Sequence, residues 1–253
     1  MLAGKRILIT GGATGIGAAT CRHLLENDAQ VAAVGLDGVA GRALASELDD
    51  GSFLFHEADL TRDADVRAAM AAATGAFGGL DGVVNAAGIY PTGKRLEDLS
   101  DEEWDRTLAV NLTAVFRVCR ATLPLLRAAG GGSVVNIASV HAEATVPGVP
   151  AYAATKGAIA ALSRQMALDY ACDRIRVNSI IVGSVATRMT LDGLDEAGGA
   201  EALGLSFSHD KVGRIAEPSE IAAVIAFLLS DASSFVTGSA VRADGGLLAR
   251  LLP

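Results

Sequence analysis

Short apolar runs alternate along the chain with longer segments whose apolar residues recur at helical spacing. Six such runs lie at 6–10, 30–34, 51–55, 82–85, 133–139 and 175–182. They are almost continuously apolar, which is typical of strands covered on both faces, whereas strands with one wet face alternate. The pattern therefore predicts a buried parallel sheet.

Helices are expected between and after these runs, at 15–27, 38–48, 62–77, 100–129, 150–171 and 217–230. Ser100 and Glu103 have the spacing of a capping box, and Pro218 stands near the first turn of the last helix. Strands and helices in alternation form βαβ units with right-handed crossovers. We predict an α/β fold, a doubly wound, Rossmann-like parallel sheet with helices on both faces.

The whole chain, 1–253, is expected to form a single domain, because no repeat, linker or low-complexity tract divides it. The segment 187–214 is irregular, with five glycines and little strand character. Ordered loops of this length are usually lids or binding loops, so we expect a substrate lid there.

Charge and cysteine content narrow the class of protein. The net charge is −8, and no basic cluster is longer than Lys94-Arg95, so the sequence shows no basic patch that would bind the phosphates of nucleic acid. Three widely spaced cysteines (Cys21, Cys119 and Cys172) are expected to be reduced thiols, and nothing suggests a metal. Without a leader-like N-terminus or an apolar run of ~18 residues, we expect a cytoplasmic protein with no membrane partner.

A glycine loop lies between the first strand and the first helix, in the stretch TGGATGIG at 10–17. Its glycines (Gly11, Gly15 and Gly17) miss the strict G-x-G-x-x-G spacing, yet they permit a tight turn and close backbone approach. The helix that begins near Gly15 points free N–H groups at a pyrophosphate. The alternative is an ordinary strand-to-helix turn.

Tyr152 and Lys156 in YAATK are four residues apart, so on a helix they share one face, and Ser139 ends the preceding strand. Oxidising an alcohol by hydride transfer needs a base, and the reverse reduction needs an acid. A lysine cation beside a tyrosine lowers the pKa of the phenol, and Ser139 can orient the substrate oxygen. The alternative is a surface aromatic residue beside a solvated lysine.

These motifs together resemble the short-chain dehydrogenase/reductase family, in its TGxxxGxG and YxxxK branch. The resemblance runs from Thr10 through NAAG at 85–88, Asn111 and YAATK at 152–156 to DGG at 244–246. It implies that Tyr152 is the proton donor or acceptor, that Ser139 polarises the carbonyl and that Lys156 also holds the nicotinamide ribose. It further implies that Asn111 positions a water molecule in a proton relay.

The implied cofactor-binding residues are Gly11, Thr14, Gly15, Ile16, Gly17, Asp37, Asp59, Leu60, Asn85, Ala86, Gly88, Tyr152, Lys156, Gly183, Val185 and Thr187. Asp59 resembles the aspartate that contacts adenine in the family, with a helix N-cap as the alternative, and Asn85 is expected to stabilise the sheet beside the ribose, with a strand cap as its alternative. The chain departs from the family at Val182, where a proline is usual. Loss of that proline returns an N–H and frees φ in the loop over the nicotinamide.

The end of the second strand bears on the choice of cofactor. Gly35 and Leu36 are followed by Asp37, and no basic residue appears before Arg42. A carboxylate there binds ribose hydroxyls and repels a 2′-phosphate, which favours NAD over NADP.

The substrate side is less defined. His141 and Glu143 follow Ser139 and are candidate substrate contacts that suit a hydroxylated substrate such as a sugar or polyol. We expect an oxidoreductase acting on a secondary alcohol or ketone, with an NADPH-dependent 3-oxoacyl-carrier-protein reductase or a non-catalytic dinucleotide-binding protein as alternatives. The family implies a homo-oligomer, tetramer or dimer, built on the helices at 100–129 and 150–171.

Overall fold

The computed structural model describes residues 2–48, 51–196, 198–201 and 205–250. Within them, seven strands form one parallel sheet in the order β3-β2-β1-β4-β5-β6-β7. The strands are β1 (Arg6–Thr10), β2 (Gln30–Gly35), β3 (Phe53–Glu57), β4 (Gly82–Asn85), β5 (Gly132–Ile137), β6 (Ile175–Val182) and β7 (Ala240–Ala243). The predicted α/β, doubly wound fold is confirmed.

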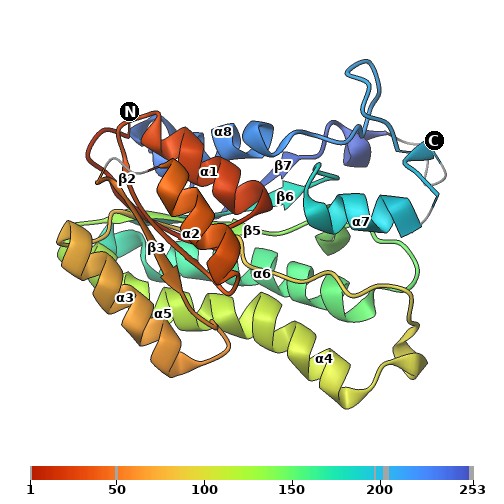
Figure 1. Ribbon diagram of the computed structural model, residues 1–253, viewed down its shortest axis with the longest axis horizontal. Coiled ribbons are helices and arrows are strands. Elements are labelled where there is room, and N and C mark those ends of the chain that lie inside the picture. Colours follow the sequence, from red (N-terminus) through yellow and green to blue (C-terminus); the bar gives the residue numbers. More distant parts are fainter. Residues whose placement is uncertain (1, 49–50, 197, 202–204, 251–253) are drawn as a thin grey trace.

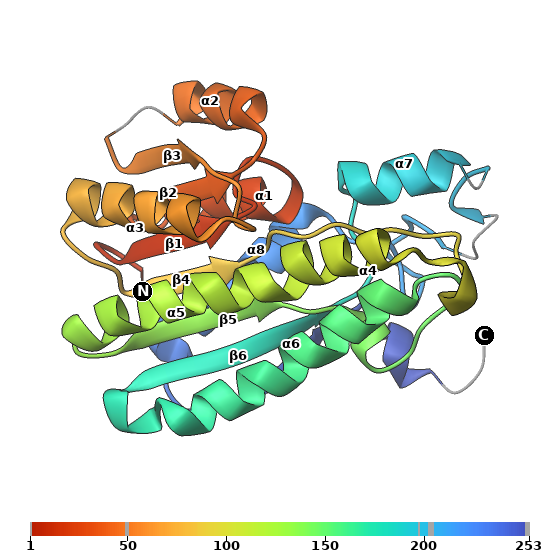
Figure 2. The ribbon, with the colours of Figure 1, turned by 90° about the horizontal axis from the view of Figure 1, so that it is seen from below.

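Helices cover both faces of the sheet (Figures 1 and 2). One face carries α1 (Gly15–Leu25), α2 (Gly38–Glu47) and α8 (Pro218–Leu229), and the other carries α3 (Asp63–Phe77), α5 (Ala114–Ala128) and α6 (Pro150–Asp169). Each face has its own apolar core. Leu24, Ile180 and Ile225 lie in the first, and Val83, Leu126 and Ile159 in the second.

The strands match the apolar runs closely, with three differences. β3 is shifted to Phe53–Glu57, since at this edge of the sheet its polar end pairs with β2 as well as the apolar part does. β5 ends at Ile137, which leaves Ser139 just beyond the strand. β7 was not predicted, because its four residues include Arg242 and depend on pairing with β6.

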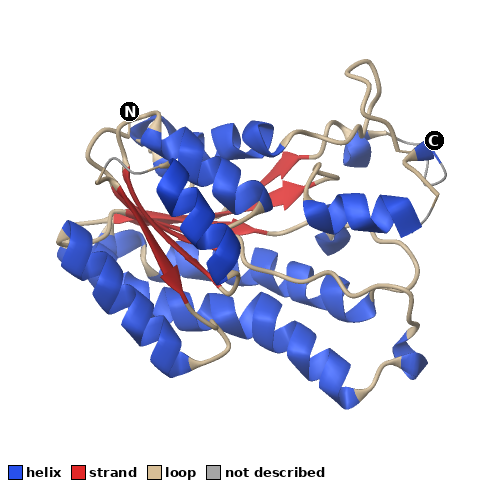
Figure 3. Cartoon of the chain, viewed as in Figure 1, coloured by secondary structure: helices blue, strands red, loops and turns tan. Residues whose placement is uncertain are grey.

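The predicted helix at 100–129 is helical without a break from Asp101 to Ala128 (Figure 3), but its middle turn is not α-helical. α4 (Asp101–Leu108) begins with the expected capping box, in which Ser100 Oγ accepts from Glu103 N at 3.2 Å. A π-helical turn, Ala109–Thr113, then joins α4 to α5. Such turns widen a helix by one residue and are frequent at functional sites.

The predicted lid also contains a helix. α7 (Arg188–Glu196) forms its first part and lies beyond the carboxyl ends of the strands (Figure 1). This helix was missed because its nine residues include Thr190 and Gly193, which are poor helix formers, and few apolar residues.

One helical stretch among the described residues, Asp101–Ala128, is long and apolar enough to cross a membrane by length and composition. Its residues Val115, Val118 and Leu126 are buried in the core of the fold. Core helices of globular proteins can have the same length and apolar composition as a membrane span. This helical stretch is therefore weak evidence for a membrane span. The three cysteines are free thiols, as expected.

The sheet order reverses between β1 and β4, since the chain first builds outward to β3 and then returns to the other side of β1. In open α/β sheets, ligands bind outside the carboxyl ends of the strands at this point. The loops that follow β1, β4, β5 and β6 meet there.

Candidate active site

The glycine loop after β1 is packed against the loop after β4. Gly11 has φ of +66°, and a Cβ on it would lie 2.9 Å from Cα of Ala87. A Cβ on Gly17 would overlap the carbonyl oxygen of Gly11. Glycine at these two positions therefore follows from contacts that a larger side chain would break.

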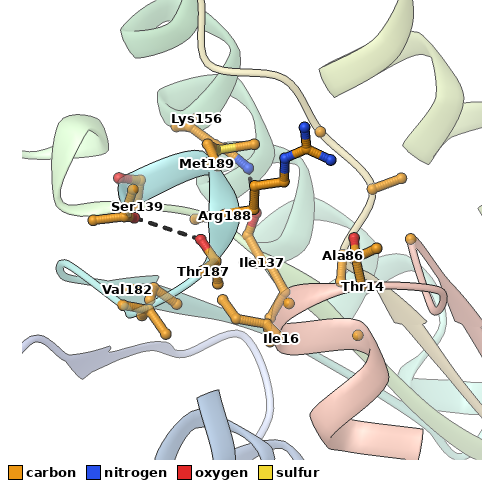
Figure 4. A pocket seen from close by; sticks show the side chains of 18 of the residues that line it. Thr14, Ile16, Ala86, Ile137, Ser139, Lys156, Val182, Thr187, Arg188 and Met189 are labelled. Atoms are coloured by element: carbon orange, nitrogen blue, oxygen red, sulfur yellow. Dashed lines mark hydrogen bonds between the residues drawn. The ribbon is translucent and has the colours of Figure 1, made fainter. Parts of the chain in front are cut away.

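A cavity of about 240 Å³ opens between this loop, the end of β5, α6 and the start of α7 (Figure 4). Predicted site residues make up most of its wall: Gly11, Thr14, Gly15, Ile16, Gly17, Ala86, Gly88, Ser139, Tyr152, Lys156, Gly183, Val185 and Thr187. Seven further residues line it, of which the sequence singled out only Val182: Ala87, Ile137, Ala138, Val182, Arg188, Met189 and Thr190. Most of these contribute backbone or apolar surface, which leaves no signal in a single sequence.

Three of the four predicted catalytic residues, Ser139, Tyr152 and Lys156, line this cavity, and the fourth, Asn111, does not. Ser139 is 6% exposed and follows β5, while Tyr152 and Lys156 are one turn apart on α6. Lys156 Nζ donates to the carbonyl oxygen of Ile137 at 2.8 Å and lies 5.4 Å from the centroid of the Tyr152 ring. Figure 4 shows Ser139, Lys156 and Thr187 among the side chains that line the cavity.

The protonation of this group differs from the prediction. Burial raises the pKa of Tyr152 to about 12; a hydrogen bond with Ser139 opposes that rise and the neighbouring Tyr90 adds to it. The prediction that Lys156 lowers the pKa of Tyr152 is wrong for this structure, because the lysine ammonium is turned to the Ile137 carbonyl. Burial lowers the pKa of Lys156 itself to about 8.

Asn111 lies in the π-helical turn and is fully buried. Its Oδ1 accepts from the backbone N–H of Ile89 at 2.8 Å, and its Nδ2 donates to the carbonyl oxygen of Ile89 at 2.9 Å. Nδ2 also lies 3.3 Å from Thr155 Oγ1 on α6. A Cβ on Gly88 would sit 3.3 Å from Asn111 Oδ1 and 3.9 Å from Lys156 Nζ, so these groups form one cluster.

Asn85 does not line the cavity but stands directly behind it. Its Nδ2 donates to Asn136 Oδ1 at 2.8 Å, and Asn136 in turn donates to Ser163 Oγ on α6 at 2.8 Å. This buried chain ties β4, β5 and α6 together, consistent with the expected role in stabilising the sheet rather than a strand cap.

The expected adenosine residues lie outside this cavity. Asp59 Oδ1 accepts from the backbone N–H and the hydroxyl of Thr61, which lowers the pKa of Asp59. Leu60, its neighbour, is buried at 8% exposure. Asp59 is not the N-cap of α3, which is Arg62, so the alternative reading of that aspartate is wrong.

Asp37 is exposed and is the N-cap of α2, where its Oδ1 accepts from Ala40 N at 3.0 Å. Arg42, the first basic residue after β2, is paired with Glu57 at 2.8 Å. The carboxylates of Asp37 and Glu57, with Arg42 paired to Glu57, therefore lie near the carboxyl ends of β2 and β3.

The two predicted substrate residues separate in the structure. The His141 ring lies beside Tyr152, with ring centroids 5.5 Å apart, and Tyr90 completes a cluster of three rings. Glu143 instead binds Arg242 of β7, Oε2 to Nη2 at 2.5 Å. Neither residue lines the cavity described above, so a substrate contact by His141 or Glu143 stays a prediction.

The loop after β6 lies close to the glycine loop. Val182 is the last residue of β6, and Gly183 leaves no room for a Cβ because Cα of Asp244 would be 2.9 Å away. The backbone N–H of Ala186 donates to Ala216 at 2.8 Å, which fixes Val185 by a β-bridge. A Cβ on Gly15 would lie 3.1 Å from Thr187 Cγ2, so the two loops close the cavity from opposite sides.

Known proteins match this chain over almost its full length. A family model described as enoyl-(acyl carrier protein) reductase matches residues 11–248. A 2,5-dichloro-2,5-cyclohexadiene-1,4-diol dehydrogenase of Sphingobium indicum is 38% identical over 249 residues, covering 98% of this chain and 98% of that protein. A 3-alpha-(or 20-beta)-hydroxysteroid dehydrogenase of Mycobacterium bovis is 40% identical over 250 residues, covering 99% and 92%.

Among solved structures, a 3-ketoacyl-(acyl-carrier-protein) reductase from Brucella melitensis complexed with NADH superimposes with a TM-score of 0.88. It is 30% identical in sequence, and the match covers 98% of this chain and 99% of that one. The fold and the cavity define an oxidoreductase of the Rossmann type that uses a nicotinamide cofactor. The chain belongs to the short-chain dehydrogenase/reductase family, whose members transfer a hydride between such a cofactor and a secondary alcohol or ketone, and this protein is an enzyme of that class.

Proposed function

We propose that Tyr152, Ser139 and Lys156 carry the proton chemistry of a hydride transfer between NAD and a hydroxylated secondary alcohol or its ketone. The observation that carries this assignment is the convergence of these three side chains and the glycine loop on one cavity. The cradle fits a nicotinamide dinucleotide, because Gly11 and Gly17 leave a surface of bare backbone at the N-terminus of α1. Among the described residues no cluster of metal ligands stands in this cavity.

The residues divide the work between substrate and cofactor. A nicotinamide cofactor supplies the hydride acceptor or donor. During oxidation, Tyr152 Oη accepts the proton of the substrate hydroxyl, and during reduction it donates a proton to the carbonyl oxygen. Ser139 Oγ donates a hydrogen bond to the same substrate oxygen, and Lys156 Nζ holds the ribose hydroxyls while keeping Ile137 in place.

Asn111 acts on this group through its neighbours. Its side chain fixes Ile89 and lies 3.3 Å from Thr155, one residue before Lys156. A water molecule held near Asn111 would connect Lys156 to solvent as a proton relay, which is the role that the family resemblance implies.

The preference for NAD is supported by charge at the end of β2. Asp37 keeps Oδ2 available for ribose hydroxyls while Oδ1 caps α2. Arg42 is already neutralised by Glu57, so a 2′-phosphate would meet two carboxylates and no spare cation there. Asp59 and Leu60 would flank the adenine.

The proposed substrate is a secondary alcohol that carries at least one further hydroxyl group, as a sugar or polyol does. A relative acts on a cyclic diol and another on a hydroxysteroid, and both names describe secondary alcohols on rings. The 3-oxoacyl-carrier-protein reductase remains the second candidate, since a structural neighbour has that activity. We further propose a cytoplasmic homo-oligomer whose contacts involve α4, α5 and α6.

Replacing Tyr152 with Phe tests the assignment while removing only one oxygen atom. We expect turnover to fall by about 10²–10⁴-fold with little change in NADH affinity. Tyr170→Phe, the same change at the end of α6, is the matched control and should retain activity. Calorimetric titration with NADH and NADPH in parallel should show tighter binding of NADH, and unchanged turnover in Tyr152→Phe would rule out the mechanism.

A further inference from the structure

We infer that Tyr90 and His141 form a second polar contact point in the substrate pocket, which binds a second oxygen atom of the substrate, so that the enzyme selects diols and hydroxyketones over simple alcohols. This inference rests on the proposed role of Tyr152, because it places the second oxygen relative to the reacting one. Tyr90 carries no motif in the sequence and lies in the irregular segment after β4.

Three aromatic rings from three segments of the chain pack together at the start of α6. Tyr90 stands edge-on to Tyr152, with centroids 4.6 Å apart and an angle of 79° between the planes. His141 stands edge-on to Tyr152 on another side at 5.5 Å, and Tyr90 and His141 are 5.6 Å apart. Both other rings therefore flank Tyr152, the residue that the reacting oxygen of the substrate has to reach.

The polar atoms of these rings form one chain of hydrogen bonds with a consistent direction. Burial lowers the pKa of His141, so the imidazole is neutral at pH 7, with one donor and one acceptor nitrogen. Nδ1 lies 2.9 Å from Thr145 Oγ1, and that hydroxyl donates to the carbonyl oxygen of Val146. Nδ1 is therefore the donor to Thr145, which leaves Nε2 as an acceptor facing the Tyr90 hydroxyl.

The contact between Tyr90 Oη and His141 Nε2 is 3.5 Å long, at the outer limit of a hydrogen bond. Both side chains are only half-buried, so each keeps capacity for a further partner. The Tyr90 oxygen can accept from a substrate hydroxyl while its own hydrogen points to His141. A substrate carbonyl can instead take that hydrogen in place of the imidazole.

This arrangement distinguishes substrates by whether they form a hydrogen bond with the Tyr90 hydroxyl. A diol or hydroxyketone satisfies Tyr152 and Ser139 with one oxygen and Tyr90 with the other. A simple alcohol of the same carbon skeleton excludes water from the Tyr90 hydroxyl but forms no hydrogen bond with it. Binding sites that form a hydrogen bond with a substrate hydroxyl discriminate strongly against analogues that lack this hydroxyl. Tyr90 thus determines specificity without taking part in the proton transfer.

Tyr90→Phe removes the hydroxyl and keeps the ring, so the contact with Tyr152 survives. The probes are cyclohexane-1,2-diol, cyclohexane-1,4-diol and cyclohexanol, tested for turnover with NAD and for binding by calorimetry at saturating NAD. We expect the wild-type enzyme to prefer at least one diol over cyclohexanol by about tenfold or more in kcat/KM, and Tyr90→Phe to lose that preference. Activity on cyclohexanol should change much less than activity on the diols, since cyclohexanol has no second oxygen for Tyr90 to bond.

His141→Phe is the second variant, since it keeps an aromatic ring and removes Nε2, and it should weaken the diol preference as well. Tyr170→Phe is the control for a tyrosine hydroxyl remote from the cavity. The inference is overturned if the wild-type enzyme binds and turns over neither diol better than cyclohexanol, or if Tyr90→Phe lowers activity on all probes equally. A different result would overturn the proposed function itself, namely that Tyr152→Phe retains its turnover.

Discussion

The side chain of Asn111 satisfies both backbone groups of Ile89, through hydrogen bonds of 2.8 and 2.9 Å. Ile89 thereby becomes an anchored point in an otherwise irregular segment, and Tyr90 is the next residue. The π-helical turn that carries Asn111 is therefore coupled to the substrate side of the pocket as well as to Lys156.

Asn111→Leu should destabilise the fold and disturb catalysis together. It fills a similar volume but leaves an N–H and a C=O of Ile89 without partners, at a cost of about 1–3 kcal/mol for each buried group. We expect a lower melting temperature and weaker substrate binding, measured by thermal unfolding and by KM. Asn111→Asp keeps the acceptor for Ile89 N–H but sets a buried carboxylate against the Ile89 carbonyl, so it should lose stability too; an unchanged melting temperature in both variants would contradict this account.

Two glycines in helices should respond to alanine in opposite ways. A Cβ on Gly17, in α1, would overlap the carbonyl oxygen of Gly11, so Gly17→Ala must shift the glycine loop. This shift should lower the free energy of unfolding by about 1–3 kcal/mol. Gly75, in α3, has no atom within 4 Å of its would-be Cβ, so Gly75→Ala should stabilise by about 0.5–1 kcal/mol. Denaturant unfolding checks both signs, and only Gly17→Ala should weaken NADH binding.

Asp37→Asn separates the two roles of that side chain. Asparagine is as good an N-cap as aspartate, so α2 should keep its stability while one negative charge is lost. The ratio of NADPH to NADH dissociation constants should move toward NADPH by about tenfold, the value of one nearby charge. Asp101→Asn, the same change in the first turn of α4, is the control; an equal shift there would indicate a general charge effect.

The parts of the site that were predictable depend on spacing within one element. Tyr152 and Lys156 share a face of α6 whatever surrounds them, and the glycines after β1 follow from the turn into α1. Ser139 was predictable because it lies directly after a buried strand. All three needed only local structure and the rule that strand ends meet at one edge of the sheet.

The parts that were not predictable depend on contacts between distant segments. The ion pair of Glu143 could not be predicted from its place near Ser139 in sequence, because its partner Arg242 is 99 residues away. Lys156 was expected to act on Tyr152, but a backbone carbonyl, which every residue has, holds its ammonium. Tyr90 meets Tyr152 only because the segment after β4 crosses the start of α6.

The raised pKa of Tyr152 gives the two directions of reaction different pH dependences. With a pKa of about 12, Tyr152 is protonated at neutral pH, which is the form that donates a proton during reduction. Oxidation needs the deprotonated form, whose fraction grows about tenfold for each pH unit below the pKa. We therefore expect kcat/KM for oxidation to rise with pH between 6 and 8, the range in which Lys156 keeps its charge.

The reverse reaction should not share that rise, because the proton donor is already present over the same range. Lys156, with its pKa lowered to about 8, loses its charge within this window, so reduction should decline above pH 8 as the grip on the ribose weakens. Initial rates in both directions between pH 6 and 10 provide the measurement, with Tyr170→Phe as the control profile. Parallel profiles would mean that Tyr152 does not carry the transferred proton, since one group cannot be acid and base with the same dependence on pH.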